Sequence, residues 1–187
     1  MSLSTRDALL KSAEVHLRSK GYAAFSYADL SEQIGIRKAS IHHHFPTKES
    51  LGEALVTQHI ELFTEQLNAI DTRHADPVLR LREFSGLFQA SINDQLLPLC
   101  GALAAEMAAL PESLKILGRN LLTQQLKWLE KTLTQAAQQH GWTLSRSVRD
   151  YAHMLLSALE GASFVDWALG PSSDPLAAFN HILDTLA

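Results

Sequence analysis

The amino-acid sequence predicts an all-α protein, in which an N-terminal three-helix helix-turn-helix module is followed by a helical body, about nine helices in total. Apolar residues recur at three- and four-residue spacing along most of the chain, and no alternating run typical of a strand occurs. Prolines and glycines fall between these periodic segments, where helices begin and end. At 187 residues the chain is long enough to bury a core of its own.

Residues that favour helix ends justify each predicted helix. Ser26 and Asp29 have the spacing of a capping box, and Gly35 supplies the left-handed backbone of a sharp turn. Pro46 ends the third helix and Thr47 caps the fourth. The predicted helices span 5–20, 26–34, 37–44, 47–70, 77–96, 100–110, 111–140, 145–170 and from 174 onward, with a loop at 71–76.

Composition limits the classes of protein and partner. The net charge is −4, but residues 1–50 carry seven Lys/Arg against five Asp/Glu, whereas residues 51–187 carry nine against fifteen. This asymmetry permits a nucleic-acid partner at the N-terminal end without demonstrating one. We expect no membrane span and no secretory signal, since no apolar run approaches 18 residues and the N-terminus lacks a basic segment followed by an apolar one. The single cysteine, Cys100, fits a cytoplasmic protein and is expected to be a buried, inert thiol, although a sensing role stays open.

The third helix has one face suited to a core and one suited to DNA. Ile41 and Phe45 share a face, because four residues correspond to about one helical turn, and they would pack on Leu30 and Ile34. The opposite face combines small, polar and basic residues, which suits a helix that enters a major groove. Its residues are Arg37, Lys38, Ala39, Ser40, His42 and His43. Such a helix-turn-helix reads a pseudo-palindrome efficiently only as a dimer.

The string SYADLSEQIGIRKASIHHHFPTKESL resembles the N-terminal module of the tetracycline-repressor (TetR/AcrR) family of transcriptional regulators. The resemblance runs from Thr5 to about Leu55 and includes the Gly35-Ile36 turn and the Thr47-Lys48 start of the fourth helix. It implies a helix-turn-helix DNA-binding domain at 1–47 and a ligand-binding and dimerisation domain at 48–187. It further implies that Arg37, Lys38 and Ser40 read bases, that Ser26, His42, Thr47 and Lys48 contact the DNA backbone, and that His43 does either. His42 departs from the family pattern, which very often has tyrosine there.

Neither a metal nor another cofactor is predicted. His42, His43 and His44 point about 100° apart on a helix, so no two of them converge on one ion as an i, i+4 pair would. No enzyme is predicted either, because the chain contains no HExxH, GxSxG or GxxxxGK[ST] motif. Whether the histidine cluster has a sensing role stays open.

The body offers candidate residues for pairing and for ligand binding. The resemblance implies a homodimer paired through its last two helices, for which the candidates are Ala158, Gly161, Ala162, Leu176, Phe179, Leu183 and Leu186. The rival interpretation is that these residues close the core of a single chain. A small-molecule effector would bind a cavity lined by Phe84, Phe88, Glu106, Asn120, Gln124, Trp128, His153, Ser157, Glu160, Phe164 and Trp167, unless the polar members face solvent or a partner subunit.

The sequence therefore predicts a homodimeric repressor that binds a double-stranded DNA operator and is released by an unknown effector. The alternative is a helical ligand-binding or scaffold protein whose helix-turn-helix does not read DNA. A steep loss of affinity with salt, together with a sequence-specific excess, would distinguish the two.

Overall fold

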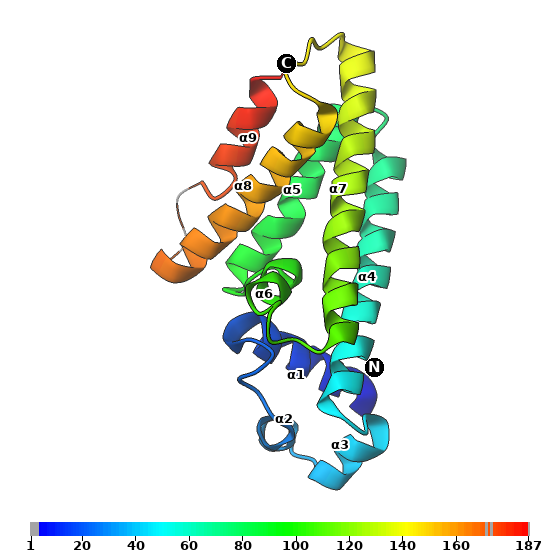
Figure 1. Cartoon of the computed structure of the whole chain (residues 1–187), viewed down its shortest axis with the longest axis vertical. Coiled ribbons are helices and arrows are strands. Elements are labelled where there is room, and N and C mark those ends of the chain that lie inside the picture. The colour runs from blue at the N-terminus through cyan, green and yellow to red at the C-terminus, as the bar shows by residue number, and fades with distance from the viewer. Residues whose placement is uncertain (1–3, 171, 173, 187) are drawn as a thin grey trace. The chain divides into compact units, whose positions relative to one another are not determined.

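The computed structural model describes residues 4–170, 172 and 174–186, and these form helices and turns without a strand (Figure 1). The all-α prediction is confirmed. Residues 1–3 and 187, at the ends of the two predicted domains, and Pro171, at the predicted end of one helix, lie outside the described residues. The helices are α1 (Thr5–Lys20), α2 (Tyr27–Ile34), α3 (Lys38–His44), α4 (Lys48–Arg73), α5 (Pro77–Asn93), α6 (Leu99–Ala105), α7 (Glu112–His140), α8 (Val148–Leu169) and α9 (Ala177–Asp184).

Two helices, α4 and α5, end at other residues than predicted. Helix α4 continues to Arg73, because the carboxylate of Asp71 accepts a hydrogen bond from Lys131 at 2.8 Å and Thr72 bonds back to its own helix. The predicted loop is therefore confined to the last three of its six residues. At its other end α5 stops at Asn93, since Gln95 has a φ of 55° that no α-helix accommodates.

The remaining corrections concern α6, α8 and α9. Helix α6 ends at Ala105, so Glu106 lies in the following turn rather than inside an apolar helix. Helix α8 begins at Val148 because Ser147 accepts a hydrogen bond from the amide of Asp150 and is the N-cap, whereas the predicted starting residue, Ser145, bonds the Tyr151 hydroxyl. Helix α9 begins at Ala177, three residues later than predicted.

The chain forms two compact units. The first comprises residues up to Leu62 together with Leu99–Leu121, and the second comprises Phe63–Pro98 and the residues from Leu122 onward. This division differs from the predicted domains, because α6 packs on α1 and belongs with the N-terminal module. Helices α4 and α7 each contribute residues to both units. No helix among the described residues is long and apolar enough to cross a membrane.

Each unit has its own core. In the first, α1 packs on α2 and α6, and α2 packs on α3, around fully buried leucines and isoleucine such as Leu9, Leu30 and Ile41. In the second, α8 packs on both α5 and α9, and Figure 1 shows it (orange) beside α9 (red). Phe84 and Phe179 are fully buried there, each removing a large apolar surface from water.

Candidate nucleic-acid interface and sites in the body

The helix-turn-helix is built as the sequence predicts. Ser26 caps α2 within a capping box, in which the Asp29 carboxylate accepts from the Ser26 backbone amide at 2.7 Å. The Ser26 hydroxyl also donates to this carboxylate, and this hydrogen bond, followed by the one from the backbone amide, lowers the pKa of Asp29, since both favour the ionised form. Gly35 then adopts φ 73° and ψ 29°, the left-handed conformation that reverses the chain, and Arg37 is the N-cap of α3. The Ser26 hydroxyl is thus committed to a helix cap.

The inner face of α3 fixes the helix on the module. Ile41 is fully buried and Phe45 is 4% exposed. The hydroxyl of Tyr27 donates to the carbonyl of Phe45 at 2.8 Å, which ties the start of α2 to the end of α3. Burial raises the pKa of Tyr27 to about 12, so the phenol remains a neutral donor. Sequence reasoning missed Tyr27, because a tyrosine in the first turn of a helix has no pattern that distinguishes it from a surface residue.

The outer face of α3 carries the predicted base readers. Arg37, Lys38, His42 and His43 are exposed, and Ser40 is partly buried. Neither Arg37 nor Lys38 has an ion pair or a hydrogen-bonded side chain within the part of the chain that the structure describes. These two cations, at the N-terminal end of a short helix, are therefore available to a ligand outside the chain.

His42 is oriented by two neighbours. Its Nδ1 lies 3.2 Å from the carbonyl oxygen of Pro46, and its ring contacts the Tyr27 ring edge-on with centroids 4.9 Å apart. A carbonyl only accepts, so Nδ1 carries the proton in this contact. The structure brings His43 and His44 into ring contact, at 5.6 Å, but no set of three potential metal ligands occurs among the described residues.

At the start of α4, Thr47 caps the helix and Lys48 packs on aromatic rings. The Thr47 hydroxyl accepts from the amide of Ser50 at 3.0 Å, and the Ser50 hydroxyl accepts in return from the amide of Thr47. Lys48 Nζ lies 4.6 Å and 4.5 Å from the ring centroids of Tyr22 and Phe25. Desolvation lowers the pKa of Lys48. The ammonium group thus already has partners within the chain, so any phosphate contact would compete with this packing.

Glu106 belongs to the first unit and not to a ligand cavity in the body. Its carboxylate accepts a hydrogen bond from the backbone amide of Ala23 at 3.0 Å, in the connection between α1 and α2. Gly21 makes the approach possible, because a Cβ there would lie 1.7 Å from Glu106 Oε1. The carboxylate therefore has the partner that sequence reasoning required, but the partner is backbone of the N-terminal module. Asn120, in the same unit, is exposed on α7.

Three predicted effector residues form an aromatic cluster in the second unit. The Phe84 ring stacks on Trp128 at 5.2 Å between centroids and contacts Phe88 at 5.7 Å. Gln124 lies one turn before Trp128 and donates to the Thr64 hydroxyl at 2.6 Å. Trp128 Nε1 and the Gln125 side-chain oxygen are buried and have no hydrogen-bond partner in the part of the chain that the structure describes. Such orphaned polar atoms cost free energy unless a ligand or water satisfies them.

The predicted stripe on α8 faces outward. His153 and Ser157 are exposed, Phe164 is 37% and Trp167 50% exposed, and Glu160 is partly buried. The structure therefore does not bring these residues together with the aromatic cluster. The buried face of α8 instead consists of Tyr151, Ala152, Leu155, Leu156, Leu159, Ser163 and Asp166.

The predicted pairing residues differ in burial between α8 and the C-terminal segment. On α9, Phe179 and Leu183 are buried within the single chain, as the rival interpretation expected. Beside its ends, Leu186 is buried and Leu176 is partly buried. On α8, Gly161 is exposed and Ala158 and Ala162 are partly buried. They adjoin an exposed apolar surface that sequence reasoning did not identify, formed by Met154, Phe164, Val165 and Leu169. Cys100 is buried on α6.

A helical body joined to a helix-turn-helix whose outer face carries exposed cations is the architecture of a DNA-binding transcriptional regulator. The family of bacterial regulatory proteins described as tetR matches residues 9–55. A TetR-family transcriptional regulator from Agrobacterium tumefaciens is 30% identical, with a TM-score of 0.92 and 97% of each chain covered. A TetR regulator from Legionella pneumophila is 26% identical, with a TM-score of 0.89 and both chains fully covered.

The chain belongs to the TetR family of transcriptional regulators. Among curated proteins, the HTH-type transcriptional repressor KstR2 of Mycolicibacterium smegmatis is 32% identical over 89 residues, which are 47% of this chain and 42% of that protein. The chain thus spans less than half the length of that relative in the alignment. The family description matches residues 9–55, whereas the similarity in structure extends over nearly the whole chain.

Proposed function

We propose that the protein is a homodimeric repressor that binds a pseudo-palindromic DNA operator and dissociates from it when a small-molecule effector binds the body. The observation that carries the proposal is the two-sided character of α3. Ile41 and Phe45 hold its inner face, while Arg37 and Lys38 project from its N-terminal end without partners among the described residues. The likeness to the transcriptional repressor KstR2 supports the repressor role, and action on DNA in bacteria implies a cytoplasmic location.

DNA contacts are proposed for eight residues in two groups. Arg37, Lys38 and Ser40 would read base edges, with His43 beside them. Ser26, His42, Thr47 and Lys48 would position the backbone. Ser26 and Thr47 stand at the N-terminal ends of α2 and α4, where the helix dipole favours a phosphate.

The exposed apolar surface of α8 supports dimerisation. Val165 is 55% exposed and Leu169 85% exposed, which is costly for a single chain in water and is relieved by an identical face across a two-fold axis. Val165→Glu should therefore convert the dimer to a monomer in sedimentation equilibrium. Leu79→Glu, an equivalent change at an exposed leucine of α5, should leave the dimer intact. A dimeric Val165→Glu variant would count against this interface.

The effector site is proposed at the aromatic cluster of the second unit. A ligand there would satisfy Trp128 Nε1 and the Gln125 oxygen while it stacks on Phe84 and Phe88. Polar atoms that lack partners in the free protein provide hydrogen-bonding specificity once a ligand arrives.

A salt titration on selected DNA tests the proposal. Genomic fragments retained by the purified protein would be measured by fluorescence anisotropy from 50 to 200 mM salt, beside scrambled duplexes of the same length. A dimer with several phosphate contacts should lose affinity by roughly three orders of magnitude and keep a sequence-specific excess. If no fragment exceeds its scrambled control, the alternative of a ligand-binding or scaffold protein is the better account.

A further inference from the structure

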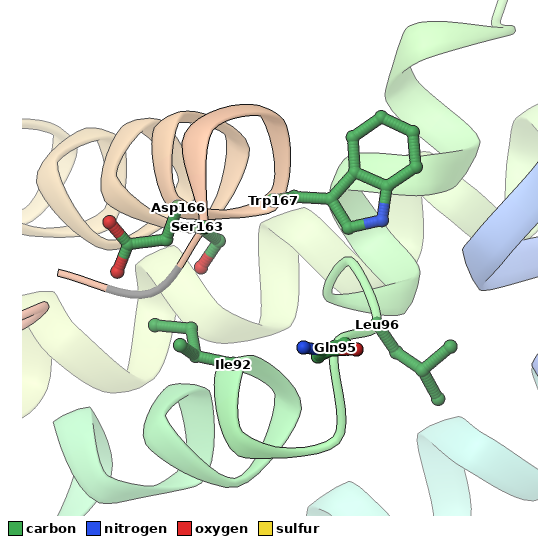
Figure 2. A pocket seen from close by; sticks show the side chains of 7 residues that line it. Ile92, Gln95, Leu96, Ser163, Asp166 and Trp167 are labelled. Carbon is green, nitrogen blue, oxygen red and sulfur yellow. The ribbon is translucent and has the colours of Figure 1, made fainter.

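A pocket separate from the aromatic cluster lies between the C-terminal ends of α5 and α8, within the second unit (Figure 2). Its volume is about 240 Å³. The last turn of α5 and the residues after it provide Ile92, Gln95 and Leu96, and the end of α8 provides Ser163, Asp166 and Trp167. This volume is below the roughly 300–1,000 Å³ of sites for drug-sized ligands, so it suits a smaller molecule.

One end of the pocket is anionic. Asp166 is only 7% exposed, and its Oδ2 accepts from the Ser172 hydroxyl at 3.0 Å. No partner for Oδ1 occurs among the described residues, and the pocket lining contains no lysine, arginine or histidine. A carboxylate that is mostly removed from water without a cation is unfavourable. A positively charged ligand group would offset that cost.

Ser163 reinforces the preference for a donor. It lies three residues before Asp166, and therefore on the same face of α8. Its hydroxyl proton is already donated to the carbonyl of Leu159 at 2.8 Å, so towards the pocket the oxygen only accepts. Two acceptors on one face match an ammonium group, which carries three donors and no acceptor. On this face of α8 an anion would meet two acceptors and a carboxylate of like charge.

The other end of the pocket is apolar. Figure 2 shows the Asp166 carboxylate and the Trp167 indole on opposite sides, with Leu96 on the side of the indole. The Trp167 side chain is half exposed and therefore accessible to a ligand. Gln95, which precedes Leu96, has a left-handed backbone conformation with φ 55°, which glutamine seldom adopts. A ligand that spans the pocket needs a cationic end and an apolar end.

We propose that this pocket binds a small primary amine that carries an apolar group, with the ammonium on Asp166 and Ser163 and the apolar group against Trp167 and Leu96. The excess of acidic residues over residues 51–187, fifteen against nine basic, also favours cations over anions near the body. This binding site does not depend on DNA binding or on the effector site proposed above.

Isothermal titration calorimetry of the full chain, without DNA, tests the proposal. The probes are 2-phenylethylamine, its neutral counterpart 2-phenylethanol, and the anion phenylacetate. We expect saturable binding of the amine with one site per chain, and at least roughly ten-fold weaker binding of the alcohol and the acid. Equal affinity for amine and alcohol, or no saturable binding of the amine at millimolar concentration, would overturn the proposal.

Matched variants locate the site. Asp166→Asn keeps the side-chain shape and an acceptor for Ser172, and should weaken amine binding by roughly ten- to hundred-fold. Asp94→Asn removes the same charge beside the pocket, just after α5, and should change the affinity by less than about two-fold. Because Asp166 is buried, thermal unfolding would verify that its variant folds. If it does not, Trp167→Leu, at a half-exposed position, should still weaken the amine several-fold. An unaltered amine affinity in a folded Asp166→Asn or Trp167→Leu variant contradicts the site.

Discussion

Replacing His42 with alanine should weaken operator binding, because two neighbours hold its ring at the end of α3. Its Nδ1 lies 3.2 Å from the Pro46 carbonyl oxygen, and its ring contacts the Tyr27 ring edge-on. Because Nδ1 is engaged by that carbonyl, Nε2 is the ring nitrogen that remains for a DNA phosphate. Tyrosine, which is common in the family at this position, would offer a hydroxyl instead.

The magnitude follows from the exposure of the histidine. An exposed polar contact contributes little, so we expect roughly a two- to five-fold loss of affinity per subunit, and roughly a four- to twenty-five-fold loss for a dimer. The neighbouring Tyr27 hydroxyl does not replace the contact, since it donates to the Phe45 carbonyl.

The assay is fluorescence anisotropy at constant pH and ionic strength, with the dissociation constant measured on a selected operator. His44→Ala, an exposed position two residues away on the same helix, is the matched control and should bind as the unaltered protein does. An unaltered affinity of the His42→Ala variant, or an equal loss in the His44→Ala variant, would refute the reasoning.

Three further predictions concern stability and packing. Gly21→Ala should lower the free energy of unfolding by about 1–3 kcal/mol in urea titrations, because Gly21 has φ 88° and ψ 161°, a region nearly restricted to glycine. An unchanged urea midpoint would show that alanine adopts this backbone without strain. Lys48→Met should weaken binding to all duplexes alike in anisotropy measurements. It should also lower the melting temperature, since the ammonium packs over the Tyr22 ring. A change in sequence preference instead would make Lys48 a base reader. The hydrogen bond from His59 lowers the pKa of Glu14, so the ionised carboxylate stabilises the fold fully at pH values above its ordinary pKa of 4.5, and this stabilisation is lost as the pH falls below that value. In the Glu14→Gln variant the free energy of unfolding should therefore decrease less steeply at acid pH. A decrease as steep as that of the unaltered protein would contradict the pairing.

Local signals explain why the N-terminal module was predictable. The capping box of Ser26 and Asp29 and the left-handed Gly35 act over a few residues, and each appears in the structure as the sequence predicted. The burial of Ile41 and Phe45 followed from helical spacing alone. The packing of Lys48 over aromatic rings did not, because its partners come from a connection more than 20 residues earlier in the chain.

The body was less predictable because helical periodicity does not say which partner covers a face. The seam of Phe179 and Leu183 packs within the chain, whereas a surface of similar apolar character on α8 stays exposed. Both have the same sequence pattern. Asp166 was overlooked for a related reason: a carboxylate near the end of a helix usually faces solvent, whereas Asp166 is 7% exposed on a helix that packs on both α5 and α9.

The central claim is that the outer face of α3 reads DNA, and the most direct test is the ratio of affinities for a selected operator and its scrambled control. The Arg37→Ala and Lys38→Ala variants should lose most of that ratio, roughly five-fold or more per altered base contact. Arg146→Ala removes the same charge from the second unit and should preserve the ratio. Loss of the ratio with Arg37 or Lys38 alone would support the account. An unchanged ratio in both variants, or an equal loss with Arg146→Ala, would contradict it.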